Sequence, residues 1–283
     1  MTAINETQTL VNLASPKMGT KIISVSDEFF GEATRMLSDQ EPVFIEDKYD
    51  THGKWMDGWE SKRRRDGGND WAIIKLGSPG IISTIEVDTS FFTGNFPPFF
   101  SLEGTDSKEI PKNDNEWVPL ITKSSLIGDQ KNNFNIESNI TLNYVRLQIF
   151  PDGGVARLRL FGEVKYDWSN FNNNELIEFS SLNLGGYIIT FNNAHYGDVS
   201  ALLSLGRGKT MGDGWETRRR REPGNDWIII KLAKKAIVKN IEIDTAHFKG
   251  NFPDQASIQA VSTSSELNIK NIIYLVLLSL ISF

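Results

Sequence analysis

Acidic and basic side chains that could bind a small anion occur together in one short block of this sequence. Asp57-Gly58-Trp59-Glu60 precedes a basic run at 62–65 that includes Arg64. Carboxylates can act as general acids, accept ligand N–H groups or hold a metal ion, and guanidinium groups bind carboxylates through two parallel hydrogen bonds. The alternative is structural: the acids pair with neighbouring arginines, and the basic run forms a solvated turn.

The same block occurs a second time further along the chain. Asp213-Gly214-Trp215-Glu216 precedes a basic run at 218–221, and Gly-Asn-Asp-Trp follows both runs, at 68–71 and 224–227. The two copies stay in register without a gap up to Gly-Asn-Phe-Pro, at 94–97 and 250–253, where a turn is predicted. More than half of the paired positions are identical. The sequence therefore contains a duplicated domain and not an array of short repeats.

The histidines distinguish the two copies. His195 stands where the first copy has Phe29, and His247 stands where it has Phe91. A single His is usually structural, but imidazoles present in one copy only indicate that this copy is specialised for acid–base work, because His titrates nearest neutrality. The third His, His52, belongs to an insertion in the first copy. No His-x-His or His-Glu-x-x-His spacing occurs, so support for a dedicated zinc site is weak.

Strand-type alternation dominates the elements that must position these residues. Apolar and polar residues alternate at 85–88, 145–149, 157–160 and 241–244, whereas 71–76 and 227–232 are more continuously apolar, as central strands buried on both faces would be. Asp88 and Asp244 end two of these strands and are expected to cap turns. Only 32–37 and 199–205 are candidates for short helices. The pattern predicts an all-β protein with two tandem jelly-roll β-sandwich repeats, the second incomplete.

Four segments are expected along the chain: a leader at 1–17, a first repeat at 18–166, a second repeat at 167–265 and an apolar tail at 266–283. The first repeat carries an insertion within 38–56, at a place where a binding rim could form. The second repeat lacks counterparts of the strand pair at 144–149 and 156–162, a loss that would expose sheet edges and an apolar face. The tail either covers part of that face or, as we favour, is an artefact of a gene model.

Composition narrows the functional classes. The 283-residue chain is 39% hydrophobic, enough for a packed core in each half, and its net charge of −6 disfavours nucleic acid as a partner. There is no cysteine, which excludes disulfides and cysteine nucleophiles and fits a reducing compartment. The first 13 residues lack the apolar stretch of a secretory signal, and the apolar stretch at 272–283 is too short to span a bilayer. These features favour a soluble, cytoplasmic protein with no membrane partner, either monomeric or a homo-oligomer.

The longest blocks resemble the allantoicase family. They are Gly-Lys-Trp-Met-Asp-Gly-Trp-Glu at 53–60, Asp-Thr-Ser-Phe-Phe-Thr-Gly-Asn-Phe-Pro at 88–97, Met-Gly-Asp-Gly-Trp-Glu-Thr at 211–217 and Asp-Thr-Ala-His-Phe-Lys-Gly-Asn-Phe-Pro at 244–253. The resemblance covers about 18–260. It implies two jelly-roll repeats and a hydrolase that acts on an amidine-type C–N bond, converting allantoate and water to ureidoglycolate and urea so that purines serve as nitrogen sources. Two departures are Asn69 and Asn225, where the family commonly has His, and the missing end of the second repeat.

That reaction would need a carboxylate clamp, an acid for the departing urea nitrogen and a base for the incoming water. In the second repeat we assign the clamp to Arg219 or Arg220, urea recognition to Asp213 and Glu216, and acid–base work to His247 with Asp244. In the first repeat we expect Asp57, Glu60 and Arg64 to bind substrate in a second or composite site. The sequence requires no cofactor, although a divalent metal ion could assist by polarising a ureido oxygen.

Two other functions remain open at this stage. Jelly rolls also occur in carbohydrate- and ligand-binding modules, and fold does not fix function. The other alternative is an inactive, truncated member of the family whose second domain cannot close.

Overall fold

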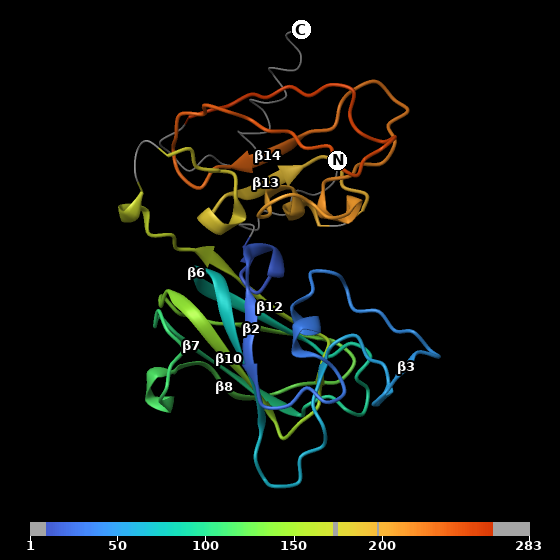
Figure 1. Ribbon diagram of the computed structural model, residues 1–283, viewed down its shortest axis with the longest axis vertical. Helices are drawn as coiled ribbons and strands as arrows, with labels where there is room; N and C mark the ends of the chain where they lie inside the picture. Colours follow the sequence, from blue (N-terminus) through green and yellow to red (C-terminus); the bar gives the residue numbers. More distant parts are fainter. Residues whose placement is uncertain (1–9, 172–174, 197, 263–283) are drawn as a thin grey trace.

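The computed structural model describes residues 10–171, 175–196 and 198–262. It is nearly all-β: the described residues form strands and short 3₁₀ helices, arranged as two units stacked along the long axis (Figure 1). The expected fold class is confirmed. No helix of the described residues is long and apolar enough to cross a membrane. The predicted apolar tail at 266–283 lies outside the described residues.

The first unit is built on one long strand, β6 (Asp70–Asp88). Residues 70–75 of β6 pair with β10 (Leu142–Phe150) and β2 (Lys21–Val25). Residues 80–88 pair with β12 (Arg157–Val164) and β9 (Lys131–Asn135). Because its two halves have different neighbours, β6 belongs to both layers of the sandwich.

The remaining strands extend these two layers. β10 pairs with β7 (Phe99–Thr105), and β7 pairs with β8 (Val118–Ser125) at the edge. β1 (Val11–Asn12) pairs with β12 on the other side of the sheet. Residues that the sequence assigned to a leader thus contribute a strand to the first unit, and Leu13 is buried in its core.

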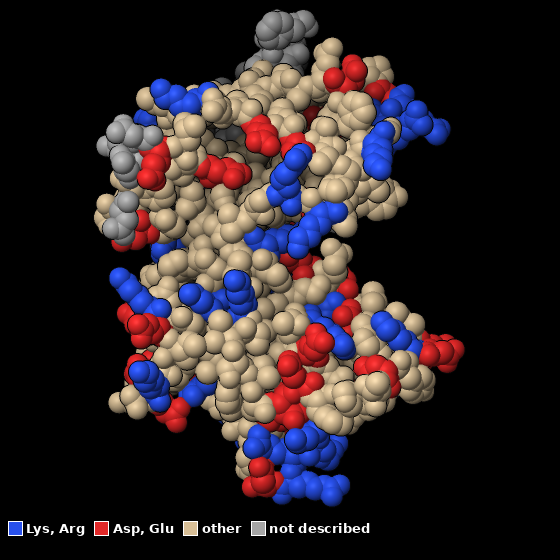
Figure 2. Space-filling model, viewed as in Figure 1, with Lys and Arg blue, Asp and Glu red and all other residues tan. Residues whose placement is uncertain are grey.

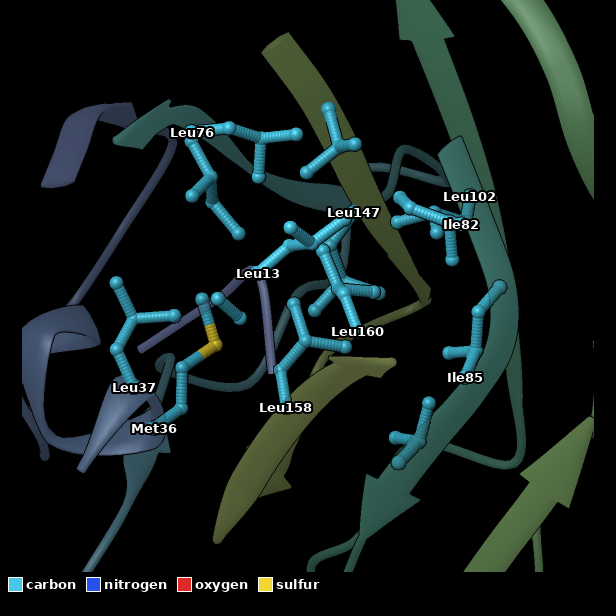
Figure 3. Packing of buried hydrophobic residues seen from close by; sticks show 14 of the residues in the cluster. Leu13, Met36, Leu37, Leu76, Ile82, Ile85, Leu102, Leu147, Leu158 and Leu160 are labelled. Atoms are coloured by element: carbon cyan, nitrogen blue, oxygen red, sulfur yellow. The ribbon is translucent and has the colours of Figure 1, made fainter. Parts of the chain in front are cut away.

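The core follows the alternation along these strands. Along β6, Ala72, Ile74 and Leu76 are buried, whereas Trp71 and Ile73 are only half-buried. The expectation that 71–76 is buried on both faces is therefore wrong, because the sandwich covers only one face of this strand. Figure 3 shows the buried face, where side chains of β6, β7, β10 and β12 meet those from the N-terminal segment and from a short helix. The labelled residues are Leu13, Met36, Leu37, Leu76, Ile82, Ile85, Leu102, Leu147, Leu158 and Leu160.

Short elements connect the strands and carry the loops. Both predicted helices are present as 3₁₀ helices, η2 (Ala33–Leu37) and η6 (Val199–Leu203). The insertion in the first repeat contains a small hairpin of β3 (Tyr49–Asp50) and β4 (Gly53–Lys54). β5 (Trp59–Glu60) follows the insertion and pairs with a two-residue strand that precedes β12.

The second unit has far fewer strands. Its described part contains one antiparallel pair, β13 (Tyr187–Phe191) and β14 (Ile228–Lys231). The strand predicted at 241–244 is not formed, and most residues from 234 to 262 are exposed. In the first unit the equivalent residues, 85–88, pair with β9 and β12 on either side. The described part of the second unit has no counterpart of β9 or β12, so this backbone lacks the neighbours that would hold it in a sheet.

The two units share an interface. Apolar side chains of the second unit, including Leu182 and Val199, belong to the same buried cluster as the core of the first unit. Ser78 Oγ donates to the Asn183 carbonyl oxygen at 2.8 Å, and the Asn183 side-chain amide donates to the Met18 carbonyl oxygen. The second unit is thus anchored to the sandwich by both apolar packing and buried hydrogen bonds.

Candidate active site

A cavity of about 510 Å³ opens beside Glu60 in the first unit. Its lining combines polar groups with aromatic and aliphatic groups. The lining residues are Phe30, Phe44, Lys54, Met56, Glu60, Phe91, Thr93, Asn95 and Asp129. They come from β4, β5, the insertion and three loops, so the folded sandwich brings together parts of the chain that are distant in sequence.

Among the titratable groups that line the cavity, Glu60 has the clearest change in pKa. The Asn95 side-chain amide donates to Glu60 Oε1 at 2.7 Å. Burial raises the pKa of the Glu60 carboxyl above its ordinary value; the Asn95 hydrogen bond opposes the shift, and the nearby Asp50 carboxylate reinforces it. A carboxyl group with a raised pKa can hold a proton closer to neutrality, as general acid–base catalysis requires.

Tight packing around Trp59 fixes the position of Glu60. Trp59 is fully buried, and its Nε1 donates to the Asp27 carbonyl oxygen at 2.8 Å. A side chain on Gly58 would come within 2.5 Å of the Val155 carbonyl oxygen, so glycine is needed where β5 approaches its partner strand. Within the Asp-Gly-Trp-Glu block, these contacts therefore require a glycine at position 58 and a buried tryptophan at position 59.

The insertion forms part of the mouth of the cavity, where the sequence suggested a rim. Phe44 lies against Phe91 with ring centroids 5.7 Å apart, and Lys54 Nζ lies 4.5 Å from the centroid of the Phe44 ring. His52 contacts Phe29, which is outside the cavity, with ring centroids 4.4 Å apart. The insertion thus contributes one aromatic and one cationic side chain to the site.

Asp57 does not line the cavity, and its side chain joins the insertion to the sandwich. Its carboxylate accepts from Arg157 Nη2 at 2.7 Å and from the Val43 backbone N–H at 3.0 Å. Arg157 is 1% exposed and also donates to the carbonyl oxygens of Asp57 and Gln40, both at 2.8 Å. These contacts indicate a structural role for Asp57, with its carboxylate engaged by the protein.

Arg64 pairs with neighbouring acids, as the structural alternative anticipated. Its guanidinium donates to Asp70 Oδ1 at 2.7 Å and to both carboxylate oxygens of Asp66, at 2.8 and 3.0 Å. The Asp66 carboxylate, stabilised chiefly by this pairing, has its pKa lowered to about 2. The basic run lines a second, open hollow of about 530 Å³, and Arg63 and Arg65 are exposed there. Figure 2 shows Lys and Arg side chains gathered at the end of the first unit that lies away from the second unit, at the bottom of the view.

The loops of the second repeat reproduce this hydrogen bonding closely. Asn251 Nδ2 donates to Glu216 Oε1 at 2.7 Å, as Asn95 does to Glu60. Trp215 Nε1 donates to the Asn193 carbonyl oxygen at 2.8 Å, and Arg220 Nη2 donates to Asp226 Oδ1 at 2.7 Å. The duplicated sequence block therefore specifies its own local geometry, even where the surrounding sheet is reduced.

The acids and the histidine of the second repeat lie in more exposed surroundings. Asp213 caps its own turn by accepting from the backbone N–H groups of Lys209 and Thr210, and it lies 3.9 Å from Lys17 Nζ of the first unit. Asp244 accepts from the Ala246 N–H at 2.8 Å, as its predicted capping role requires, and it also pairs with an exposed arginine, Arg207.

The remaining predicted residues of the second repeat have different neighbours. His247 Nε2 is 2.9 Å from the Gly208 carbonyl oxygen. Arg219 is exposed, whereas Arg220 pairs with Asp226, so the two candidates for the clamp differ in how freely they could meet a ligand. The structure thus places Glu216 beside Asn251 and places His247 beside Gly208.

Of the lining residues, only Glu60 was singled out as functional from the sequence; those missed include Lys54, Phe44, Asn95 and Asp129. Asn95 could have been found from the sequence, because Gly-Asn-Phe-Pro occurs in both repeats. The prediction of a turn was, however, sufficient to explain why that sequence is repeated. Phe44 and Lys54 belong to the insertion and have no repeated counterpart to mark them. Within the described part of the chain, no three His, Asp or Glu side chains are grouped so that they could hold a metal ion.

Comparisons with known proteins agree with this architecture. A family model for the allantoicase repeat matches residues 11–165 and 177–273. Probable allantoicase 2 of Burkholderia mallei is 46% identical over 255 residues, which cover 90% of this chain and 76% of that protein. The probable allantoicase of Acinetobacter baylyi is 47% identical over 252 residues, covering 89% and 75%.

A solved structure shows the same fold. The crystal structure of allantoicase from Saccharomyces cerevisiae superimposes with a TM-score of 0.70 at 34% identity and covers 82% of this chain and 70% of that chain. The duplicated loops, the sandwich built on β6 and the extent of these matches agree on one assignment. The chain belongs to the allantoicase family.

Proposed function

We propose that this chain hydrolyses allantoate to ureidoglycolate and urea, in the breakdown of purines for nitrogen, and that the cavity of the first repeat is its active site. Membership of the allantoicase family supports the reaction. The observation that supports the location is the carboxyl of Glu60, which lines the cavity, has one oxygen held by Asn95 and has a raised pKa.

The reaction replaces one ureido group by a hydroxyl at the central carbon of allantoate. The bond from that carbon to the ureido nitrogen breaks, a bond to the oxygen of water forms, and one proton of water ends on the departing urea nitrogen. Glu60 in its protonated form would give a proton to that nitrogen, and as a carboxylate it would then accept one from water. One group with a pKa raised toward neutrality can serve both steps.

The other polar residues of the cavity match the remaining parts of the substrate. The Lys54 ammonium group supplies positive charge for the carboxylate of allantoate. Thr93 and Asn95 offer a hydroxyl and an amide, which suit the N–H and C=O groups of a ureido group. In this proposal Asp57 and Arg64 support the site through the contacts described above.

The second repeat is the other candidate location. Its Glu216 is held by Asn251 at the same 2.7 Å distance as its counterpart, and His247 lies on the adjoining turn. In that case the assignments from sequence apply: Asp213 and Glu216 recognise urea, Arg219 or Arg220 binds the carboxylate, and His247 with Asp244 transfers protons.

Urea release from allantoate, followed in purified protein, tests the function and its location. We expect turnover by the wild-type chain and a loss of about 10²- to 10⁴-fold in kcat for Glu60→Gln. The matched variant Glu216→Gln, which alters the same amide–carboxyl pair in the other repeat, should retain most activity. The reverse result would place the reaction in the second repeat, and a wild-type chain that binds allantoate or a sugar without releasing urea would refute the enzymatic function.

Cellular location and assembly are further parts of the proposal. The absence of cysteine fits a reducing compartment, so we propose that the protein acts in the cytoplasm, with allantoate as its small-molecule partner. Whether the chain forms a homo-oligomer can be measured by sedimentation velocity at the concentrations used for the assay.

A further inference from the structure

Left-handed backbone conformations mark one wall of the cavity. Among the described residues other than glycine, three have positive φ: Phe91 at 69°, Asp129 at 56° and His247 at 73°. Bulky residues rarely adopt this region because their Cβ approaches the backbone, and such strain gathers at functional sites. Phe91 and Asp129 line the same cavity, and His247 is the counterpart of Phe91 in the second repeat.

A direct hydrogen bond links Phe91 and Asp129. The Phe91 backbone N–H donates to Asp129 Oδ1 at 2.7 Å. Behind them, the backbone N–H of Asp129 donates to the carbonyl oxygen of Thr89 at 3.1 Å, and the Thr89 N–H donates to the carbonyl oxygen of Gln130 at 2.9 Å. Thr89 is fully buried, so the two loops are joined at a fixed point of the sandwich. The Phe91 backbone is therefore held by a contact from another loop, in a conformation that its counterpart His247 also adopts.

The consequence of this conformation is the position of the Phe91 ring. The ring stacks on Phe44 with an interplanar angle of 27°, and Lys54 Nζ lies over the other aromatic ring of the pair. Phe44 and Phe91 are 44% and 39% exposed, and both line the cavity, so their paired rings offer an apolar face to a ligand. Flat conjugated groups such as urea fit well against aromatic faces of this kind.

The second repeat lacks this arrangement. It has no counterpart of the insertion, and so no equivalent of Phe44 or Lys54. The side chain at the strained position is His247, whose ring nitrogen lies 2.9 Å from the Gly208 carbonyl oxygen. The aromatic wall is thus a property of the first repeat only.

We propose that Phe44 and Phe91 form the wall that selects an unsubstituted ureido group, and that Asp129 is a positioning residue that holds Phe91 in place. This inference rests on the proposed function and adds its substrate preference: linear ureido carboxylates whose terminal nitrogen carries no alkyl group. In this proposal the paired rings contact the terminal ureido nitrogen, and Lys54, which lies over the Phe44 ring, orients the carboxylate.

Competition between two substrates tests the wall. The ratio of kcat/KM for allantoate to kcat/KM for its analogue methylated on the terminal ureido nitrogens is measured for the wild type and for Phe44→Ala. Because one methylene group is worth about tenfold in an apolar pocket, we expect the ratio to fall by about tenfold or more in the variant. Tyr49→Ala is the matched control, because Tyr49 is an exposed aromatic residue of the same insertion that does not line the cavity; its ratio should equal that of the wild type.

Paired substitutions of Asp129 test the positioning role. Asn keeps an oxygen that can accept from the Phe91 N–H and tolerates left-handed backbone, whereas Ala offers neither. We expect Asp129→Ala to raise KM for allantoate about tenfold with little change in kcat and to relax the preference against the methylated analogue. Asp129→Asn should restore both quantities to near wild-type values.

The results separate this inference from the proposed function. A wild-type chain that releases no urea overturns both. If the wild type is active and Glu60→Gln is not, an unchanged substrate ratio in Phe44→Ala overturns the wall alone. If Asp129→Asn is as damaging as Asp129→Ala, the carboxylate acts on the substrate itself and the positioning role is wrong. Circular dichroism and thermal unfolding of each variant identify any that has failed to fold.

Discussion

The amide–carboxyl pair shows that single residues in the two repeats are held in the same way although their surroundings differ. Asn95 and Asn251 donate to Glu60 and Glu216 at the same distance, 2.7 Å. Burial raises the pKa of the Glu60 carboxyl, which lines the cavity. The local contact is therefore encoded in the repeated block, whereas the electrostatic environment that makes the carboxyl useful depends on the rest of the unit.

Replacing Asn95 by Ala gives a pH-dependent prediction at this scale. The Asn95 hydrogen bond stabilises the carboxylate form of Glu60 and so lowers its pKa against the larger effect of burial. Its loss should raise the pKa further. Because the reaction starts from the protonated carboxyl, the alkaline limb of the kcat/KM–pH profile should move to higher pH. Measurement of that profile between pH 4 and about 9 tests the shift, with Asn251→Ala as the control that should leave the limb in place. A limb that moves to lower pH would contradict the assignment of Glu60.

Elements formed by strand alternation were largely predictable. The strands that include 85–88, 145–149 and 157–160 occur where alternation placed them, because a sandwich buries one face of each strand. The strand predicted at 241–244 fails for a reason that alternation cannot reveal, namely that the described second unit offers no neighbouring strand. A strand requires partners as well as a pattern.

The site was less predictable than the fold for a related reason. Glu60 was identified because an acid beside a basic run is a candidate for binding or catalysis. Its partner Asn95 was missed, because the Gly-Asn-Phe-Pro sequence around it was interpreted only as a turn. Lys54 and Phe44 come from a short hairpin with ordinary composition, and only the folded chain brings them to the cavity. Conversely, Arg64 and Asp57 were predicted from the sequence to bind substrate, but their charged groups form ion pairs within the protein.

Removal of Arg157 tests the element that fixes the insertion. This side chain links β12 to the Asp57 loop and to Gln40 at the start of the insertion, all within a buried environment. Because loss of one partner of a buried pair leaves the other uncompensated, Arg157→Met should lower the free energy of unfolding by about 3–5 kcal/mol. Lys165→Met, which removes a solvent-exposed ion pair with Glu163, should cost about 1 kcal/mol or less. Urea denaturation monitored by Trp fluorescence compares them, and equal losses would show that Arg157 is no special anchor.

At the scale of the whole molecule, the two repeats are unequal partners. The first repeat forms a sandwich of eight paired strands, whereas the described second repeat contributes one strand pair and a few short helices. The N-terminal part of the second unit is nevertheless packed against the first unit, since Leu182, Ile188 and Leu203 belong to the same buried core. The segment after β14 has little of this support, because most of its residues are exposed and few of its backbone groups are paired.

Limited trypsin digestion should expose this inequality. Lys234, Lys235, Lys239 and Lys249 are exposed in the segment after β14, where few backbone hydrogen bonds resist local opening. The basic run at 62–65 is also exposed, but Arg64 is held by Asp66, Asp70 and, through its backbone N–H, by Asp152. The basic run at 218–221 of the second repeat is exposed as well, so we expect the first cuts between 218 and 249, identified by mass spectrometry of the fragments.

The trimmed fragment then tests where the reaction occurs. It retains the sandwich, the insertion and the cavity around Glu60, together with the part of the second unit that packs into the core. It loses Asn251, the residue that holds Glu216, and with the most N-terminal cuts His247 as well. If the first repeat carries the chemistry, the fragment should keep most of the urea-releasing activity of the intact chain. Activity that disappears in step with cleavage, while the fragment stays folded by circular dichroism, would instead assign the reaction to the second repeat.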